Sequence, residues 1–95
     1  MDNHSILLVD DEPAILEMLV TIFTQAGYTN LATASDGAGA LAQMRRKMPD
    51  LVILDVMLPD TDGFSLLRDI RAVGRTPVLM LTARGEAGDR IAGLE

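Results

Sequence analysis

The chain has 95 residues, a formal net charge of −6 and no cysteine. Its length fits one small domain, taken here as residues 1–95, and excludes a two-domain enzyme. The absence of cysteine excludes disulfides and thiolate metal sites, and the negative charge argues against a nucleic-acid surface. No apolar run approaches the roughly 20 residues of a membrane span, and Met1 to Ser5 begins no signal peptide. We therefore expect a cytoplasmic protein that contacts neither membrane nor nucleic acid.

Four short apolar runs predict strands, at residues 5–9, 30–34, 51–56 and 77–81. The first run is branched and apolar, as a strand covered on both faces must be. The run at 30–34 is weaker, which predicts a position near an edge of the sheet.

Between these runs, apolar residues recur at helical spacing and predict helices at 13–26, 37–48, 63–73 and from residue 86 onward. Pro13 suits the first position of a helix, and Gly27 suits the position just after a helix end. The last helix is predicted from the spacing of Ile91 and Leu94.

Strand and helix alternate four times, which favours an α/β fold with a doubly wound parallel sheet and helices on both faces. Right-handed crossovers restrict the strand order, and we expect 2-1-3-4. In such sheets ligands bind beyond the carboxyl ends of the strands where the order reverses, here between the first and third strands. Asp10 and Asp11 follow the first strand, and Asp55 lies at the end of the third. We therefore expect these three carboxylates to converge on one crevice.

Three carboxylates a few ångström apart repel one another, so without a counter-charge at least one should have a raised pKa. Mg²⁺ takes one or two carboxylates together with water and phosphate oxygens, and it neutralises charge while a carboxylate attacks a phosphoryl group in line. Aspartate serves as a covalent acceptor in such reactions. At the end of the fourth strand, Thr82 would offer its hydroxyl to a phosphoryl oxygen, and Ala83 its backbone amide.

The acidic residues also have simpler interpretations. Asp10, Asp11 and Glu12 would cap the helix that follows them, and this role is compatible with binding a cation. Residues 60–63 resemble part of a calcium loop, but Leu58 occupies the first ligand position and no Glu closes the loop. A turn followed by a helix cap is the better interpretation of residues 60–63.

A competing motif lies at residues 37–42, which match the loose glycine pattern of a dinucleotide-binding loop. Asp55 follows at about the distance expected of an acid that binds ribose. However, Asp36 would place a carboxylate where the pyrophosphate must lie, and this interpretation leaves Asp10, Asp11 and Thr82 without a role. Saturable binding of NADH would support it.

Residues 6–13 (ILLVDDEP), 51–60 (LVILDVMLPD), 62–64 (DGF) and 77–83 (PVLMLTA) resemble the receiver domain of bacterial two-component response regulators. The resemblance covers the whole chain and implies a flavodoxin-like fold. Residues 89–95 look most like the OmpR/PhoB-like subfamily, in which a DNA-binding winged helix follows the receiver.

The resemblance implies that Asp55 accepts a phosphoryl group from a phosphohistidine on a sensor histidine kinase. It implies that Asp11, Asp55 and the backbone carbonyl of Met57 hold Mg²⁺, while Asp10 holds a metal-bound water. Thr82 matches the family's switch hydroxyl. The expected role is that of a regulatory phosphoacceptor, not an enzyme, which assists its own Mg²⁺-dependent phosphoryl transfer and hydrolysis.

The sequence departs from the family at its C-terminal end, where receivers add a fifth strand, a fifth helix and a lysine that contacts the phosphoryl group. Lys47 is the only lysine here, and it is predicted at a helix end far from the crevice. We therefore expect a C-terminally incomplete receiver whose strand 77–81 forms an exposed edge that pairs with another chain. The alternative function is a phosphorylation-incompetent fragment that acts as a structural or interaction module, as a dimer or a strand-exchanged oligomer.

Overall fold

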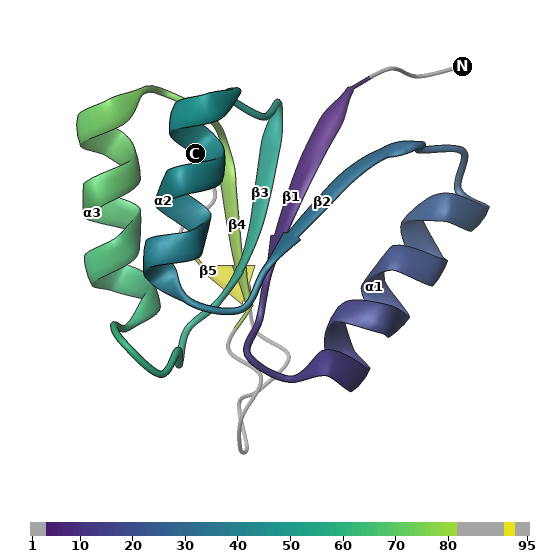
Figure 1. Cartoon of the computed structure of the whole chain (residues 1–95), viewed down its shortest axis with the longest axis horizontal. Helices are drawn as coiled ribbons and strands as arrows, with labels where there is room; N and C mark the ends of the chain where they lie inside the picture. Colours follow the sequence, from purple (N-terminus) through teal and green to yellow (C-terminus); the bar gives the residue numbers. More distant parts are fainter. Residues whose placement is uncertain (1–3, 82–90, 93–95) are drawn as a thin grey trace.

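The computed structural model describes residues 4–81 and 91–92 of the chain (Figure 1). Its elements, in chain order, are β1 (Ser5–Val9), α1 (Pro13–Gln25), β2 (Asn30–Ala34), α2 (Gly37–Arg46), β3 (Leu51–Asp55), α3 (Gly63–Val73), β4 (Val78–Leu81) and β5 (Ile91–Ala92). Within the described ranges, no helix is long and apolar enough to cross a membrane.

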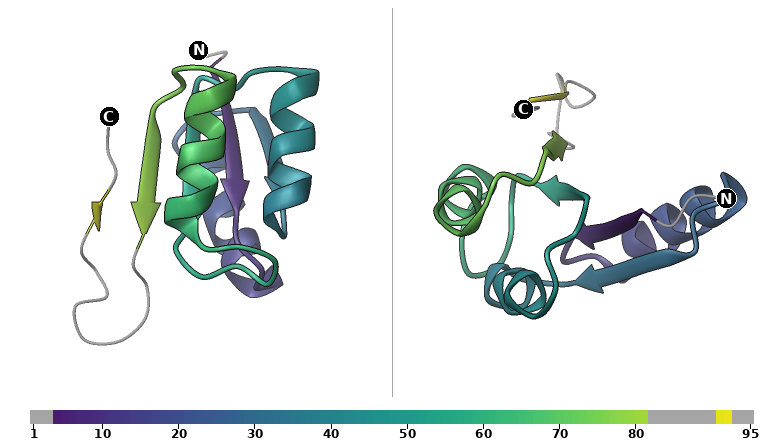
Figure 2. Two further views of the ribbon diagram at one scale, coloured as in Figure 1. Left: turned by 90° about the vertical axis from the view of Figure 1, so that its left-hand side faces the viewer. Right: turned by 90° about the horizontal axis from the view of Figure 1, so that it is seen from above.

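The strands form a single sheet in the order β2-β1-β3-β4-β5. The first four are parallel, and their register places Val9 beside both Ala34 and Leu54. Helices α2 and α3 cover one face, and α1 lies on the other (Figure 2). The predicted doubly wound sheet with strand order 2-1-3-4 is confirmed, as is the edge position of β2. The strand order reverses between β1 and β3, at the place where the sequence predicts a ligand crevice.

The ends of the helices follow from local residue chemistry. Pro13 is the first residue of α1, where its missing N–H removes no hydrogen bond. Gly27 follows that helix with a φ of 104°, a left-handed conformation that side chains disfavour. The Oδ1 atom of Asp36 accepts a hydrogen bond of 2.7 Å from the backbone N–H of Gly39 and so caps α2.

The core lies mainly between the sheet and the pair α2–α3. Its most enclosed side chains include Leu54 on β3, Leu66 on α3 and Met80 on β4, all of which are fully buried. On the other face, the buried residues Ile6, Leu8 and Ile53 pack against partly buried side chains of α1 and β4. The strands that position the crevice are therefore fixed chiefly by the α2–α3 side.

The predicted helix from residue 86 is wrong at Ile91 and Ala92, which form β5. These two residues pair in antiparallel register with Leu81 and Met80 of β4. The expectation that strand 77–81 forms an exposed edge is therefore wrong at Met80 and Leu81, which pair with a strand of the same chain. A strand edge exposes unpaired backbone groups, and pairing them overrides the helical spacing on which the prediction rested. The other residues of that predicted helix lie outside the described part of the chain.

Candidate phosphoacceptor and metal site

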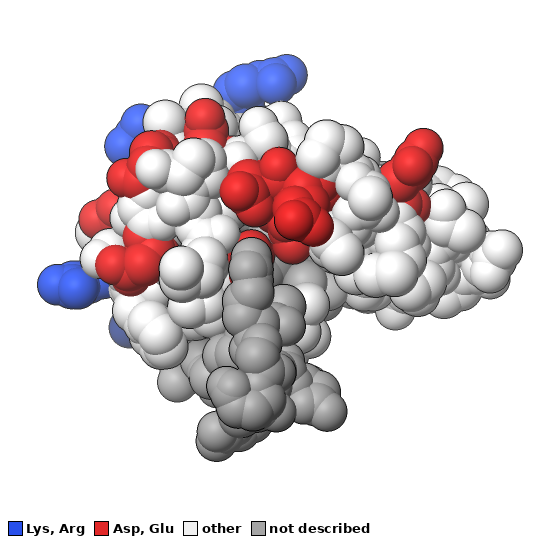
Figure 3. Space-filling view, turned by 90° about the horizontal axis from the view of Figure 1, so that it is seen from below, with Lys and Arg blue, Asp and Glu red and all other residues white. Residues whose placement is uncertain are grey.

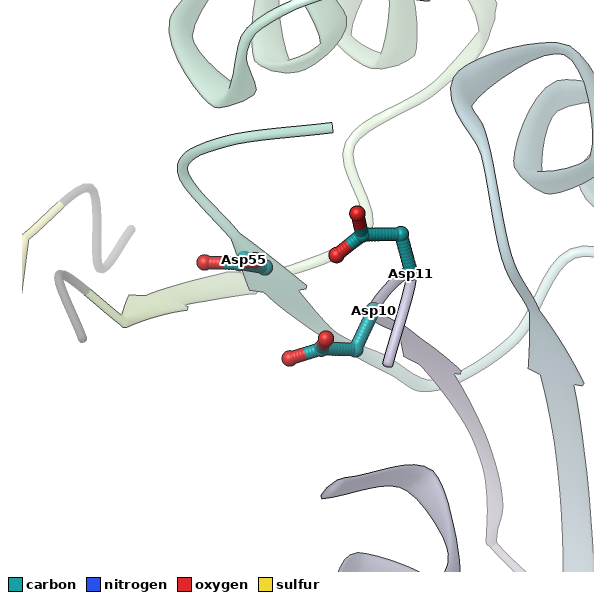
Figure 4. A group of neighbouring side chains, drawn as sticks. All are labelled: Asp10, Asp11 and Asp55. Carbon is teal, nitrogen blue, oxygen red and sulfur yellow. The ribbon is translucent and has the colours of Figure 1, made fainter. Parts of the chain in front are cut away.

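Three carboxylates that are distant in sequence meet at the carboxyl ends of β1 and β3 (Figure 4). Because Val9 pairs with Leu54, the next residues of the two strands, Asp10 and Asp55, lie beside each other. Asp11 follows directly, and one oxygen from each carboxylate lies within 4.8 Å of the others. The convergence predicted from the topology is present.

Burial and mutual repulsion set the electrostatics of this cluster. Asp10 and Asp55 are only 8% and 4% exposed, whereas Asp11 is exposed. Burial raises the pKa of Asp10, and the neighbouring charges of Asp55, Asp11 and Glu12 raise it further. A hydrogen bond of 2.9 Å from the Glu12 backbone N–H to Asp10 Oδ1 works in the opposite direction and supports the ionised form.

Among the described residues on this face, no cluster of positively charged side chains adjoins the three carboxylates. Figure 3 shows acidic side chains gathered in the middle of this face, whereas the lysine and arginine side chains in view lie at its margin. A cation bound from solution would reduce the electrostatic repulsion among these negative charges.

The donor set fits a hard divalent cation. Three carboxylates at this spacing supply the oxygen ligands that Mg²⁺ prefers, and Asp11 is open to solvent for the waters that this ion retains. Met57, the fourth expected ligand, lies two residues beyond Asp55 in the loop between β3 and α3. Its backbone forms an isolated antiparallel β-bridge with that of Asp62. No other group of three such side chains among the described residues meets the same spacing.

The simpler interpretation of the first acids, as caps of α1, has limited support: Asp10 accepts a hydrogen bond from the backbone N–H of Glu12, the residue before this helix. Glu12 occupies its N-cap position and makes no side-chain capping hydrogen bond. The capping interpretation of Asp62 is correct, because its Oδ1 accepts a hydrogen bond of 2.7 Å from the Ser65 backbone N–H at the start of α3. Asp62 is therefore engaged as a helix cap, as expected from the turn interpretation of that loop.

The start of α2 also argues against the dinucleotide alternative. The first backbone N–H groups of this helix, at Gly37, Ala38 and Gly39, all donate to carboxylate oxygens of Asp60 and Asp36. A pyrophosphate would have to displace both carboxylates to reach these donors.

Sequence reasoning missed the part that Asp60 plays here. It assigned residue 60 to a turn, whereas its carboxylate binds a helix that begins 23 residues earlier. No local sequence pattern predicts this contact, because it depends on how the loop after β3 lies against α2.

The remaining predicted site residues are Thr82 and Ala83, which lie outside the described residues. Lys47 is placed as predicted, at the C-cap of α2. This ten-residue helix is about 15 Å long, and its other end is the one in contact with the loop after β3. Lys47 therefore does not supply a positive charge at the crevice.

A cavity of about 330 Å³ adjoins the carboxylates on the side of α1. Asp10 and Asp55 line it together with the apolar side chains of Met18, Leu19 and Leu81. In the described part of the chain, the crevice therefore adjoins a cavity on the α1 side of the sheet.

Comparison with known proteins decides the family. Residues 6–95 match the family described as the response regulator receiver domain. The chain belongs to this family. Among its relatives is "Probable transcriptional regulator ycf27" of Guillardia theta, 47% identical over 93 residues, which cover 98% of this chain and 36% of that protein. Another is "Probable transcriptional regulatory protein TcrX" of Mycobacterium tuberculosis, 47% identical over 91 residues, which cover 95% of this chain and 38% of that protein.

The receiver fold is found in solved structures as well. One is the N-terminal domain of a response regulator receiver protein from Methanoculleus marisnigri, with a TM-score of 0.81 and 39% sequence identity. The alignment covers 90% of this chain and 71% of that structure. The expected family and the flavodoxin-like fold are confirmed, and the relatives named above bear the names of probable transcriptional regulators, in keeping with the OmpR/PhoB-like resemblance. The chain spans less than two fifths of their length.

Proposed function

We propose that this receiver is a phosphoacceptor in which Asp55 takes a phosphoryl group from the phosphohistidine of a sensor histidine kinase, with Mg²⁺ as cofactor. The observation that carries the proposal is the convergence of Asp10, Asp11 and Asp55 at the reversal of the strand order, with ligand oxygens within 4.8 Å of one another. A receiver needs a metal site at its acceptor, and these three residues offer one.

In the proposed reaction, a carboxylate oxygen of Asp55 bonds to phosphorus while the P–N bond of the phosphohistidine breaks. The imidazole leaves with the bonding electron pair and takes a proton from solvent. Asp55 is the last residue of a buried strand, so its carboxylate is held at a fixed position for in-line attack. When bound, Mg²⁺ supplies positive charge that offsets the charge on the donor oxygens.

We assign the metal to Asp11, Asp55 and the backbone carbonyl of Met57, with Asp10 holding a water on the ion. We assign the contacts with the phosphoryl oxygens to the Thr82 hydroxyl and the Ala83 backbone amide. Burial is the main cause of the raised pKa of Asp10, and repulsion from Asp55, Asp11 and Glu12 adds to it, so a bound cation would offset that repulsion and favour the ionised form of Asp10.

The expected consequence is regulatory. A phosphoryl group adds about two negative charges at one point, and this biases a surface between two states. In a longer parent protein, that surface would address a DNA-binding output domain, in keeping with the OmpR/PhoB-like resemblance. We place the protein in the cytoplasm, where a sensor kinase presents its phosphohistidine.

The test is an intact mass measurement after the chain is incubated with Mg²⁺ and acetyl phosphate. The parent chain should gain a single phosphoryl adduct, which should be absent in Asp55→Asn and absent when EDTA removes the metal. Asp69→Asn is a matched control, because it makes the same chemical change at an exposed position on α3 and should keep the adduct.

An adduct that persists in Asp55→Asn would move the acceptor to another residue. A folded parent chain that gains no adduct would favour the alternative of a phosphorylation-incompetent interaction module. Circular dichroism on the same samples establishes that each variant is folded.

A further inference from the structure

The loop between β3 and α3 is tied to the start of α2 through the side chain of Asp60. Asp60 Oδ1 accepts a hydrogen bond of 2.8 Å from the Gly37 backbone N–H, and Oδ2 accepts one of 3.1 Å from the Ala38 backbone N–H. Both oxygens therefore bind the positive end of a helix that precedes Asp60 by more than 20 residues. These hydrogen bonds hold the pKa of Asp60 below its ordinary value, so the carboxylate is ionised at neutral pH.

The close approach of the loop to α2 depends on the glycine at position 37. Gly37 is buried, and a Cβ atom there would lie 2.6 Å from the Thr61 Cγ2 atom and 3.3 Å from Asp60 Oδ1. A side chain at position 37 would force the Thr61 side chain to shift and would crowd the Asp60 carboxylate that binds the helix. The contact between the loop and α2 therefore requires both the carboxylate of Asp60 and the absence of a side chain at Gly37.

The same loop carries the residues that the proposed function uses. It begins directly after Asp55 and includes Met57, and it closes on itself through a hydrogen bond of 3.2 Å from the Leu58 backbone N–H to the Thr61 carbonyl. Its far end is fixed where the Gly63 backbone N–H donates to the Val56 carbonyl. Asp60 lies between these anchor points and connects the loop to a different element of the fold.

We propose that Asp60 is a positioning residue, which fixes the loop after β3 against α2 and so holds the Met57 carbonyl in place for the metal beside Asp55. The contact also makes the start of α2 move together with the acceptor loop. This inference rests on the proposed function for its chemical consequence, although the contact itself is tested without any ligand.

Asp36 provides a matched control within the same helix. Both aspartates bind backbone N–H groups in the first turn of α2, but Asp36 does so from the adjoining residue and Asp60 from the loop. Asp36→Ala and Asp60→Ala each remove one negative charge and one cap. Only Asp60→Ala should release the loop.

The experiment combines amide hydrogen exchange of the metal-free 95-residue chain with a Mg²⁺ titration. In Asp60→Ala, exchange should become about tenfold faster at Gly37, at Ala38 and through residues 57–61, and the dissociation constant for Mg²⁺ should rise severalfold. In Asp36→Ala, faster exchange should be confined to the start of α2 and the metal affinity should stay near that of the parent.

Two further variants separate position from charge. Asp60→Asn loses the same charge as Asp60→Ala but keeps one acceptor oxygen, so it should restore part of the metal affinity and of the loop protection. Gly37→Ala changes no charge and improves helix propensity, yet it should loosen the loop and weaken Mg²⁺ binding because of the clash with Thr61.

The proposal is overturned if Asp60→Ala leaves exchange of the loop unchanged, or if Asp36→Ala weakens Mg²⁺ binding as much as Asp60→Ala does. Equal losses of affinity in Asp60→Asn and Asp60→Ala with no change in loop exchange would reduce Asp60 to a nearby charge and also overturn it. A parent chain that binds no Mg²⁺ contradicts the proposed function instead, and the exchange of the loop then decides the positioning role alone.

Discussion

In the described part of the chain, the core cluster between the sheet and the helices α2 and α3 contains eleven buried residues, whereas the cluster on the face under α1 contains three. Helix α3 buries Leu66 and Ile70, but α1 buries none of its residues. Two views at right angles show the same contrast, with α2 and α3 on one side of the sheet and α1 on the other (Figure 2). Since burial of apolar area is the main favourable term in folding, the α2–α3 face supplies most of the stability.

This difference bears on the candidate site, because Asp10 and Asp55 stand at the ends of strands that both faces share. The face under α2 and α3, called the closed face here, fixes the strands and therefore the carboxylates. On the face under α1, a cavity lined by Met18, Leu19 and Leu81 lies beside Asp10 and Asp55. The carboxylates therefore lie between a well-packed face of the sheet and a cavity on the side of α1.

The largest expected effect comes from breaking the closed face. Leu66→Ala removes a fully buried side chain from α3 and should lower the free energy of unfolding by about 2–5 kcal/mol. Leu19→Ala makes the same change on the partly buried face of α1 and should cost about 1 kcal/mol. Urea unfolding of both variants measures the contrast, and equal losses would show that the two faces contribute alike.

A smaller effect should separate the two helix starts. Asp62 caps α3 through its hydrogen bond with the Ser65 backbone N–H, so Asp62→Ala should cost about 1 kcal/mol of folding free energy. Glu12 holds the corresponding position of α1 without a side-chain capping bond, so Glu12→Ala should leave the stability nearly unchanged. Thermal unfolding of the two variants compares them directly, and a larger loss for Glu12→Ala would refute this account of the caps.

The smallest of these effects concerns Asp10 and depends on pH. Because its folded pKa is raised, the native chain keeps this proton to a higher pH than the unfolded chain does, and stability falls as the pH rises through the raised pKa. Asp10→Asn should therefore be more stable than the parent at neutral pH without metal. The difference should vanish below the ordinary value of 3.8. Urea midpoints measured in EDTA across this range, with Asp69→Asn as control, test the sign; a difference that is independent of pH would contradict it.

Much of the fold could be predicted from the sequence because a parallel sheet requires short, continuous apolar strands. The predicted strands 5–9 and 30–34 match β1 and β2, and the other two differ by one residue at an end. The convergence of Asp10 and Asp55 followed from topology alone, since both end strands that neighbour each other at the reversal.

What failed or was missed depends on contacts distant in sequence. Ile91 was expected in a helix, but its backbone pairs with the edge of β4 at Leu81 and forms β5. The contact between Asp60 and the start of α2 joins segments whose proximity no local spacing encodes. In both cases a partner elsewhere in the fold decides the conformation or the role of the residue.

The most direct test of the central claim is the unfolding temperature of the chain measured with and without Mg²⁺. A ligand that binds only the native state at about 100 times its dissociation constant adds about 2.7 kcal/mol of stability, which should raise the unfolding temperature by several degrees. The account predicts that this rise is reduced in Asp11→Ala and in Asp55→Asn, and retained in Asp69→Asn. A parent chain whose unfolding temperature does not respond to Mg²⁺, or a full response in Asp55→Asn, would contradict the assignment of the three carboxylates as a metal site.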